Sequence, residues 1–212
     1  KSEEKKIVGV SVKQCNNKTP TNAQVFFSTA TAFYNLVVNN RMNLSQKALK
    51  AMRQFCGDPG FRPLDDYDCS GRISTPERYF WEEIDAEGKA EWESLFKNHQ
   101  DDVTRLLLQK AYLNDPFPPE IILHKTKKAT SFDNQEIAVF TIDEFINLSR
   151  RFSSFTFSYY RVRKGSHKEP EGISHQAPRF GVVQIQRGGQ KQHPTQLQFN
   201  LKAGYFYDLD KL

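Results

Sequence analysis

Small or polar residues alternate with β-branched residues in a short stretch near the start of the chain. Val8, Val10 and Val12 lie in the sequence IVGVSVKQCNN, between a charged run and a polar run. This composition favours a buried β-strand, with the valines on one side and Ser11 and Lys13 on the other. Such a strand would direct a lysine and several amides toward one place, which is a common way to build a site. An ordinary edge strand that runs into a solvated loop is the alternative.

Apolar residues recur at helical spacing in several later stretches. The predicted helices span 23–39 after a cap at Thr21 or Asn22, 45–55 ended by Gly57, a region from Pro76 toward 100, 101–113, and a short helix to 151 capped by Thr141 or Asp143. Side-chain caps and a terminal glycine mark these ends because they satisfy backbone groups that the helix leaves unpaired.

Alternating strands dominate the C-terminal part of the sequence. We predict strands at 120–124, 136–140, 155–161, 180–187 and 196–202, with a polar loop at 163–178. The last two strands are joined by a glycine-containing segment and form a predicted hairpin. The fold class is therefore mixed α/β (α+β), a mixed sheet flanked by helices. The predicted parts are a core strand with helices at 1–57, an acidic helical insertion at 58–118, and a mixed β/α part with a basic hairpin at 119–212.

Charge is distributed unevenly along the 212 residues, whose formal net charge is +5. Residues 65–102 contain twelve acidic and four basic side chains, whereas 150–202 contain ten basic and two acidic ones. Acids at this density on helices are usually a solvated face and not a metal site. A polyanionic partner would meet the C-terminal third of the chain.

Several classes of protein are disfavoured. Three cysteines without paired spacing argue against a disulfide framework and for a reducing compartment. The histidines and cysteines lack zinc-ligand spacing, and no apolar run approaches the roughly 20 residues of a membrane helix. The sequence also lacks a Gly-x-Ser-x-Gly nucleophile motif and a glycine-rich phosphate loop.

The predicted final hairpin is rich in side chains that can contact DNA bases. Ten of them fall within seventeen residues: Gln184, Gln186, Arg187, Gln190, Lys191, Gln192, His193, Gln196, Gln198 and Asn200. Gln and Asn can bind adenine with two hydrogen bonds, and Arg or Lys can bind guanine, in a major groove that admits a two-stranded ribbon. The alternative is a polar outer face on an amphipathic hairpin.

Two segments resemble the PD-(D/E)xK nuclease superfamily, and type II restriction endonucleases in particular. The string VSVKQCNN is similar to the Ser-x-Lys form of the second half of that motif, and QIQRGGQK with QLQFN is similar to a hairpin near the end of several such enzymes. The resemblance implies a restriction-endonuclease-like core and Mg²⁺-dependent, sequence-specific hydrolysis of phosphodiester bonds in double-stranded DNA. From the cysteines and the lack of a long apolar run we expect a cytoplasmic protein without membrane association, and a homodimer is compatible with the resemblance.

The resemblance assigns roles to particular residues. Lys13 would stabilise charge on the attacked phosphate or help to activate water, and Ser11 would contribute through a metal-bound water. The implied DNA-binding residues are Gln14, Asn16, Asn17, Lys18, Asn22, Arg187, Gln190, Lys191, Gln192, His193 and Gln196. Within the hairpin we expect base contacts from at least one of Arg187, Gln190 and Gln192, and a phosphate contact from Lys191.

The sequence departs from the family pattern at the metal ligands. Ser11 stands where the family usually has Glu or Asp, and no Asp precedes Lys13. The sequence also starts without a methionine directly before a core-like strand. We therefore expect the first motif aspartate to lie in sequence upstream of Lys1, with Glu3 or Glu4 as the alternative. A non-catalytic sequence-specific DNA-binding module is the alternative function, and a protein-interaction domain built on the acidic helices is a third.

Overall fold

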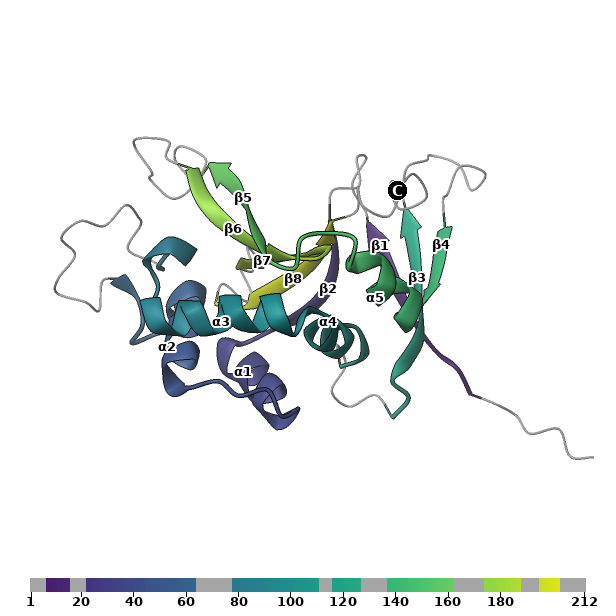
Figure 1. Ribbon diagram of the computed structural model, residues 1–212, viewed down its shortest axis with the longest axis horizontal. Coiled ribbons are helices and arrows are strands. Elements are labelled where there is room, and N and C mark those ends of the chain that lie inside the picture. The colour runs from purple at the N-terminus through teal and green to yellow at the C-terminus, as the bar shows by residue number, and fades with distance from the viewer. Residues whose placement is uncertain are drawn as a thin grey trace, which may run out of the picture.

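A computed structural model describes residues 7–15, 22–63, 78–110, 116–126, 137–161, 174–187 and 195–202. The fold is mixed α/β, with two β-sheets side by side and helices packed along them (Figure 1). The strands are β1 (Gly9–Cys15), β2 (Asn22–Ser28), β3 (Pro119–Thr126), β4 (Ile137–Thr141), β5 (Thr156–Arg161), β6 (Ser174–Phe180), β7 (Val183–Arg187) and β8 (Leu197–Lys202). The helices are α1 (Ala30–Asn39), α2 (Gln46–Cys56), α3 (Ala86–Asn98), α4 (Gln100–Gln109) and α5 (Ile142–Ser149), with a 3₁₀ turn at Trp81–Glu83.

The smaller sheet is mixed and has the order β1-β3-β4. β1 pairs with β3 in parallel, and β3 pairs with β4 in antiparallel orientation. A parallel pair needs a long connection between its strands, and here that connection contains β2 and the helices α1 to α4. β1 therefore lies at one edge of this sheet, next to β2 of the second sheet.

The larger sheet is antiparallel and has the order β2-β8-β7-β6-β5. β7 and β8 pair from Val183↔Leu201 to Arg187↔Leu197, which confirms the predicted final hairpin. β2, from the N-terminal part of the chain, pairs with the outer edge of β8. One face of this sheet is apolar and covered by helices, and the opposite face is rich in amides.

Helix ends follow the capping chemistry that the sequence contains. The Ser45 side chain accepts from Lys47 N at the start of α2, and Gly57 ends that helix in the left-handed conformation with φ 72°. Thr141 caps α5 and forms a reciprocal capping box with Glu144. The predictions for these two helices are confirmed.

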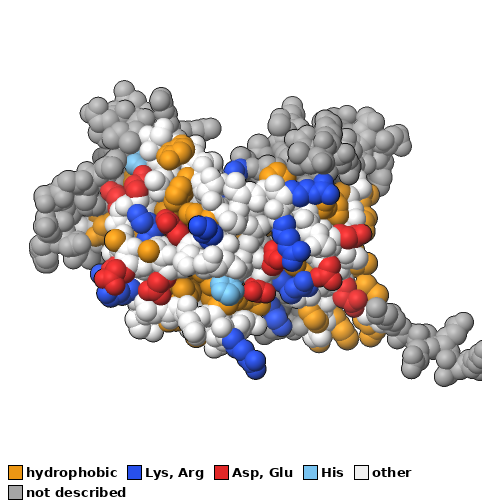
Figure 2. Space-filling model, in the orientation of Figure 1, with side chains coloured by type: hydrophobic (Ala, Val, Ile, Leu, Met, Phe, Trp, Pro, Cys, Tyr) orange, Lys and Arg blue, Asp and Glu red, His pale blue; other side chains and the backbone are white. Residues whose placement is uncertain are grey.

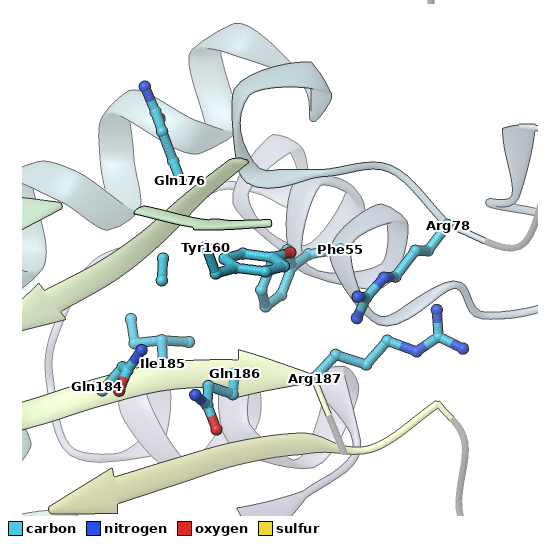
Figure 3. Close-up of a pocket in the computed structure, with 9 residues that line it drawn as sticks. Phe55, Arg78, Tyr160, Gln176, Gln184, Ile185, Gln186 and Arg187 are labelled. Carbon is cyan, nitrogen blue, oxygen red and sulfur yellow. The ribbon is translucent and has the colours of Figure 1, made fainter. Parts of the chain in front are cut away.

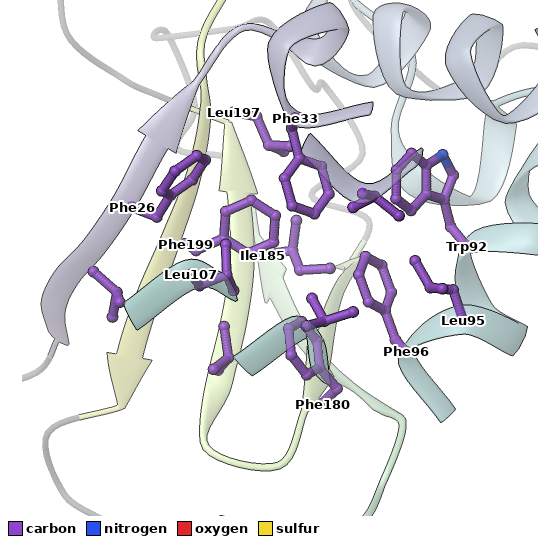
Figure 4. Packing of buried hydrophobic residues seen from close by; sticks show 14 of the residues in the cluster. Phe26, Phe33, Trp92, Leu95, Phe96, Leu107, Phe180, Ile185, Leu197 and Phe199 are labelled. Carbon is purple, nitrogen blue, oxygen red and sulfur yellow. The ribbon is translucent and has the colours of Figure 1, made fainter. Parts of the chain in front are cut away.

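One continuous hydrophobic core joins the larger sheet to the helices (Figure 4). Its centre is aromatic: Trp92 stacks on Phe33 with ring centroids 5.3 Å apart, and Phe33 contacts Phe199 of β8 at 4.6 Å. The Trp92 indole also donates a hydrogen bond of 2.7 Å to the Ala48 carbonyl in α2. The cluster takes buried side chains from each of the three predicted parts of the chain. The boundaries at 57 and 118 remain a prediction.

The close approach of α2 and α3 depends on Gly88. An added Cβ at this position would lie 2.1 Å from the Lys47 carbonyl oxygen and 2.8 Å from the Ala51 Cβ. Alanine is the better helix former by about 1 kcal/mol. Here the close contact with the backbone dominates, because the Lys47 carbonyl belongs to the first turn of α2 and can move only if the helix backbone moves with it.

We therefore expect Gly88→Ala to destabilise the protein by about 1–3 kcal/mol, the usual range for overpacking. Urea unfolding, followed by fluorescence, measures this difference. A variant at least as stable as the wild type would show that α2 and α3 can separate without cost.

Three secondary-structure predictions made from the sequence were wrong. Residues 22–28 form β2, and α1 begins only at Ala30 after the cap Thr29, so neither Thr21 nor Asn22 starts a helix. The pairing of β2 with β8 overrides the helical spacing of the apolar residues there. Residues 174–178, predicted within a loop, belong to β6, which continues to Phe180, and the predicted strand at 180–187 is interrupted by a turn at Gly181 and Val182. Gly181 has φ +49°, which permits this tight connection.

The structure also shows which side of β1 is buried. The strand and its alternation are confirmed, but the valine side faces outward: Val8, Val10 and Val12 are 42%, 50% and 59% exposed. The buried side carries Ser11 and Lys13 instead. The pattern fixes which residues share a side, and the position of the neighbouring sheet decides which side is inside.

Candidate active site and polar sheet face

Ser11, Lys13 and His124 form an inward cluster where the two sheets meet. Ser11 and Lys13 lie on the buried side of β1, at 6% and 4% exposure. His124 lies beside Lys13 in the β1–β3 register and is 1% exposed. Registered neighbours of a parallel pair point to the same face, so the strands hold these three polar side chains together.

A bulge in β2 gives Lys13 a hydrogen-bond acceptor. The pairing of β2 with β8 shifts between Gln24 and Phe26, so Val25 has no partner in that ladder. A bulge leaves the extra residue unpaired. The Lys13 Nζ donates to the Val25 carbonyl oxygen at 3.4 Å, which links the smaller sheet to the larger one.

Burial shifts the proton affinity of both basic members of the inward cluster. It lowers the pKa of the Lys13 ammonium, because a charged group loses hydration inside the protein. It lowers the pKa of the His124 imidazole for the same reason, so His124 is neutral at pH 7. The cluster therefore places a lysine with reduced proton affinity beside a neutral imidazole.

The depressed pKa of His124 predicts a loss of stability in acid. The unfolded state takes up the histidine proton near pH 6.5, whereas the folded state takes it up only at lower pH. Stability contributed by neutral His124 is therefore complete above about pH 6.5 and falls as the pH decreases, by at most about 1.4 kcal/mol per pH unit. We expect His124→Asn to remove this contribution to the change of unfolding free energy with pH between pH 5 and 7.

Urea unfolding at several pH values checks this expectation. The matched control is His99→Asn, which removes an exposed histidine at the end of α3. A pH dependence unchanged by His124→Asn, or removed equally by His99→Asn, would contradict the assignment.

Among the described residues there is no group of three or more Asp, Glu, His or Cys side chains that could hold a metal ion. Ser11 supplies a hydroxyl and Val25 a carbonyl, whereas Mg²⁺ in proteins relies on one or two carboxylates. The predicted carboxylate alternatives Glu3 and Glu4 lie outside the described residues.

The outer face of the larger sheet carries a row of amide side chains. Gln24 of β2 accepts a hydrogen bond of 2.9 Å from Gln198 of β8, and Asn200 of β8 donates one of 2.8 Å to Gln186 of β7. These bonds cross the sheet from strand to strand and fix the orientation of the amides. The opposite face of the same strands contributes Ile185, Leu197 and other core residues, so the hairpin is amphipathic as its alternation predicts.

The described ranges contain only part of the predicted DNA-binding set. Outside them lie Asn16, Asn17, Lys18, Gln190, Lys191, Gln192 and His193, and for Gln14 and Asn22 only the strand backbone is described. Arg187 ends β7 opposite Leu197, and Gln196 directly precedes β8, so these two lie at the same end of the hairpin. Asn22 pairs with Lys202 and lies at the other end of β8.

Sequence reasoning missed two members of the site and one residue of the polar face. His124 was predicted only as the end of a strand, and Val25 and Gln24 were placed in a helix. An isolated histidine at the end of an apolar run carries no distinctive signal. Gln24 could have been found from the alternation of Ala23, Gln24 and Val25, which has the period of a strand.

The described part of the acidic helical region shows mixed surface charge. Figure 2 shows Lys and Arg side chains lying among Asp and Glu side chains on the face that includes α3 to α5. Ion pairs join Arg105 to Asp143, Arg150 to Asp101 and Lys47 to Glu87. Exposed pairs of this kind add little stability. They agree with the interpretation of the acids as a solvated face.

No family model matches the chain, and no curated protein matches it significantly. The helices of the described residues are all too short or too polar to cross a membrane. The site must therefore be interpreted from its own geometry.

Proposed function

We propose that this protein is a sequence-specific endonuclease that hydrolyses phosphodiester bonds of double-stranded DNA, with Mg²⁺ as its cofactor. The observation that carries the proposal is the inward cluster, in which a buried lysine lies between a serine and a histidine on two paired strands. Burying a lysine is costly, and proteins retain such groups mainly where they serve a function.

The role proposed for Lys13 follows from its surroundings. In a site that excludes water, an ammonium group stabilises developing negative charge on a phosphate much more than it would in solvent. The lowered pKa of Lys13 also brings it closer to exchanging a proton at neutral pH. Neutral His124 beside it can accept a hydrogen bond from Lys13 or from water. Mg²⁺ would supply charge neutralisation at the phosphate, through carboxylates outside the described residues.

The hairpin supplies support for DNA as the substrate. Amide groups aligned on rigid strands can pair with base edges, and Arg187 at the end of β7 can bind guanine or phosphate. Lys13 contacts Val25 of β2, and Arg187 lies on β7, two strands away across the sheet and about three residues further along. The distance from Val25 to Arg187 is therefore on the order of 14 Å. That separation corresponds to about four base steps of about 3.4 Å. One duplex is thus long enough to contact both.

A non-catalytic DNA-binding module is the second candidate, and the burial of Lys13 favours it. A lysine that is 4% exposed and bonded to a backbone carbonyl could simply hold the two sheets together. In that case the hairpin alone would carry the function.

The deciding experiment incubates full-length protein with unmethylated phage and plasmid DNA, in Mg²⁺ or in EDTA. We expect discrete fragments in Mg²⁺ only. A parallel binding titration in EDTA at two salt concentrations measures the phosphate contribution, because affinity for DNA falls steeply with salt. Salt-dependent binding without cleavage would establish the second candidate, and absence of binding would reject both.

A further inference from the structure

A split in the larger sheet opens a pocket that the proposed cleavage site does not use. β6 and β7 form only two pairs, Arg179↔Gln184 and Phe180↔Val183, and then diverge. The pocket between them has a volume of about 210 Å³ (Figure 3). It is bordered by the facing edges of β6 and β7, by Tyr160 of β5 and by Phe55 of α2. Beyond Gln184 the β7 edge facing β6 is unpaired in this ladder, which leaves backbone donors and acceptors directed at the pocket.

Side-chain amides add hydrogen-bonding groups to these edges. Gln176 of β6 and Gln184 of β7 both line the pocket, and neither side chain makes a hydrogen bond within the part of the chain described. Each amide provides two donor hydrogens and an acceptor oxygen. The two side chains lie on opposite faces of the sheet, because Gln184 pairs with Arg179 and Gln176 has the opposite alternation, and Figure 3 shows Gln176 directed away from the cavity. The Gln184 amide is therefore the one that can hydrogen-bond to the polar edge of a planar ligand.

Aromatic surfaces form part of the wall. Tyr160 and Phe55 both line the pocket, and Figure 3 draws their rings among the lining side chains. Tyr160 is held in place by edge-to-face packing on Phe80, with centroids 6.5 Å apart. Burial raises the pKa of the Tyr160 hydroxyl, so it stays neutral and can donate a hydrogen bond. A planar ring with polar edges suits such a wall.

Two arginines line one side of the pocket. Arg78, before the 3₁₀ turn, and Arg187, at the end of β7, reach the same side in Figure 3. The described lining includes no carboxylate. The neighbouring Glu82 is engaged elsewhere, because it contacts His175 Nδ1 at 2.9 Å and accepts from Gln176 N at 3.2 Å. Paired guanidinium groups are suited to phosphate oxygens.

We propose that this pocket binds a single nucleotide, with its base between the β6 and β7 edges and its phosphate at Arg78 and Arg187. The volume lies below the roughly 300 Å³ at which sites for larger ligands begin, so it fits one base and not two. An extended peptide could also pair with the open edges, but it would need neither the arginines nor the ring wall. The nucleotide can come from an extruded position of a DNA strand or from solution. For DNA as the source, the inference rests on the proposed function.

The test compares two duplexes in EDTA, where no cleavage occurs. One contains a single unpaired adenosine, and the other contains an abasic residue at the same position. We expect the wild type to bind the adenosine duplex about tenfold more tightly than the abasic duplex. Extruding an unpaired base costs little free energy, and stacking of the base on aromatic rings stabilises the extruded state. Gln184→Leu and Arg78→Gln should each reduce this preference to about twofold or less. Arg151→Gln, which removes an exposed arginine outside the pocket lining, should retain it.

A second arm identifies the source of the nucleotide and separates this inference from DNA cleavage. The four deoxynucleoside monophosphates are titrated into each protein and followed by NMR or calorimetry. If the wild type binds a monophosphate and Gln184→Leu does not, the result supports nucleotide binding in the pocket, even if the protein binds no duplex. The protein could instead bind both duplexes equally and bind no monophosphate. That result would overturn the proposal of a nucleotide pocket but leave the proposal of DNA binding intact. Thermal melting of each variant confirms that it is folded.

Discussion

Replacement of Lys13 by methionine is expected to reduce DNA cleavage at least about 100-fold while leaving the protein as stable as the wild type or more stable. The loss follows from the proposed role of the ammonium group, since removing one preorganised charge or donor from a phosphate-transfer site typically costs a factor of about 10²–10³. Methionine has a similar length, so the space between β1 and β2 remains filled. The variant also removes a charge whose burial opposes folding, as the lowered pKa of Lys13 indicates.

The combination of the two measurements distinguishes a catalytic lysine from a structural one. Cleavage rates under single-turnover conditions and urea unfolding are measured on the same preparations. Lys47→Met, at an exposed position in α2, is the matched control and should leave cleavage unchanged. Full activity of Lys13→Met would remove the lysine from the mechanism. A large loss of stability with unchanged cleavage per folded molecule would show that Lys13 serves only to join the sheets.

The second large effect is expected in the core, where Trp92→Ala should destabilise the protein by about 3–5 kcal/mol. Trp92 is fully buried, stacks on Phe33 and Phe96, and donates to the Ala48 carbonyl. Its removal leaves a cavity between helices and sheet that backbone shifts cannot close. Because domains of this size are stable by only about 5–15 kcal/mol, such a loss leaves the variant marginal.

Chemical denaturation of three variants tests this expectation. Trp92→Phe keeps most of the apolar volume and should cost less than Trp92→Ala. Tyr159→Ala, which removes an aromatic ring that is 65% exposed, should change stability by no more than about 0.5 kcal/mol. A cost below about 1.5 kcal/mol for Trp92→Ala would mean that the core around α3 is not packed as described.

Local chemistry was sufficient where an element carries its own boundary signals. Ser45 and Gly57 mark the two ends of α2, and Thr141 marks the start of α5, because caps act on backbone groups within a few residues. The final hairpin was predictable for a similar reason, since the alternation of each strand is local and the two strands follow one another in the sequence. These features do not depend on which distant segment packs against them.

β2 shows where local information fails. Its apolar residues fit a helical stripe as well as a strand, and only the pairing with β8, some 170 residues later in the chain, decides between them. The bulge at Val25 arises from the same distant pairing, and it exposes the carbonyl that Lys13 contacts. A site that depends on such a bulge has no signature in its own sequence.

The sequence by itself determined that Ser11 and Lys13 lie on the same side of a strand. It also determined that the amide side chains of the final hairpin lie on one face of its two strands. It also determined the mixed α/β class. Only the tertiary structure decided that the Ser11–Lys13 side is buried, that His124 lies beside Lys13, and that β6 and β7 separate around Tyr160. The physical reason is that backbone periodicity is set by neighbouring residues, whereas burial is set by the surfaces that other elements bring to each side.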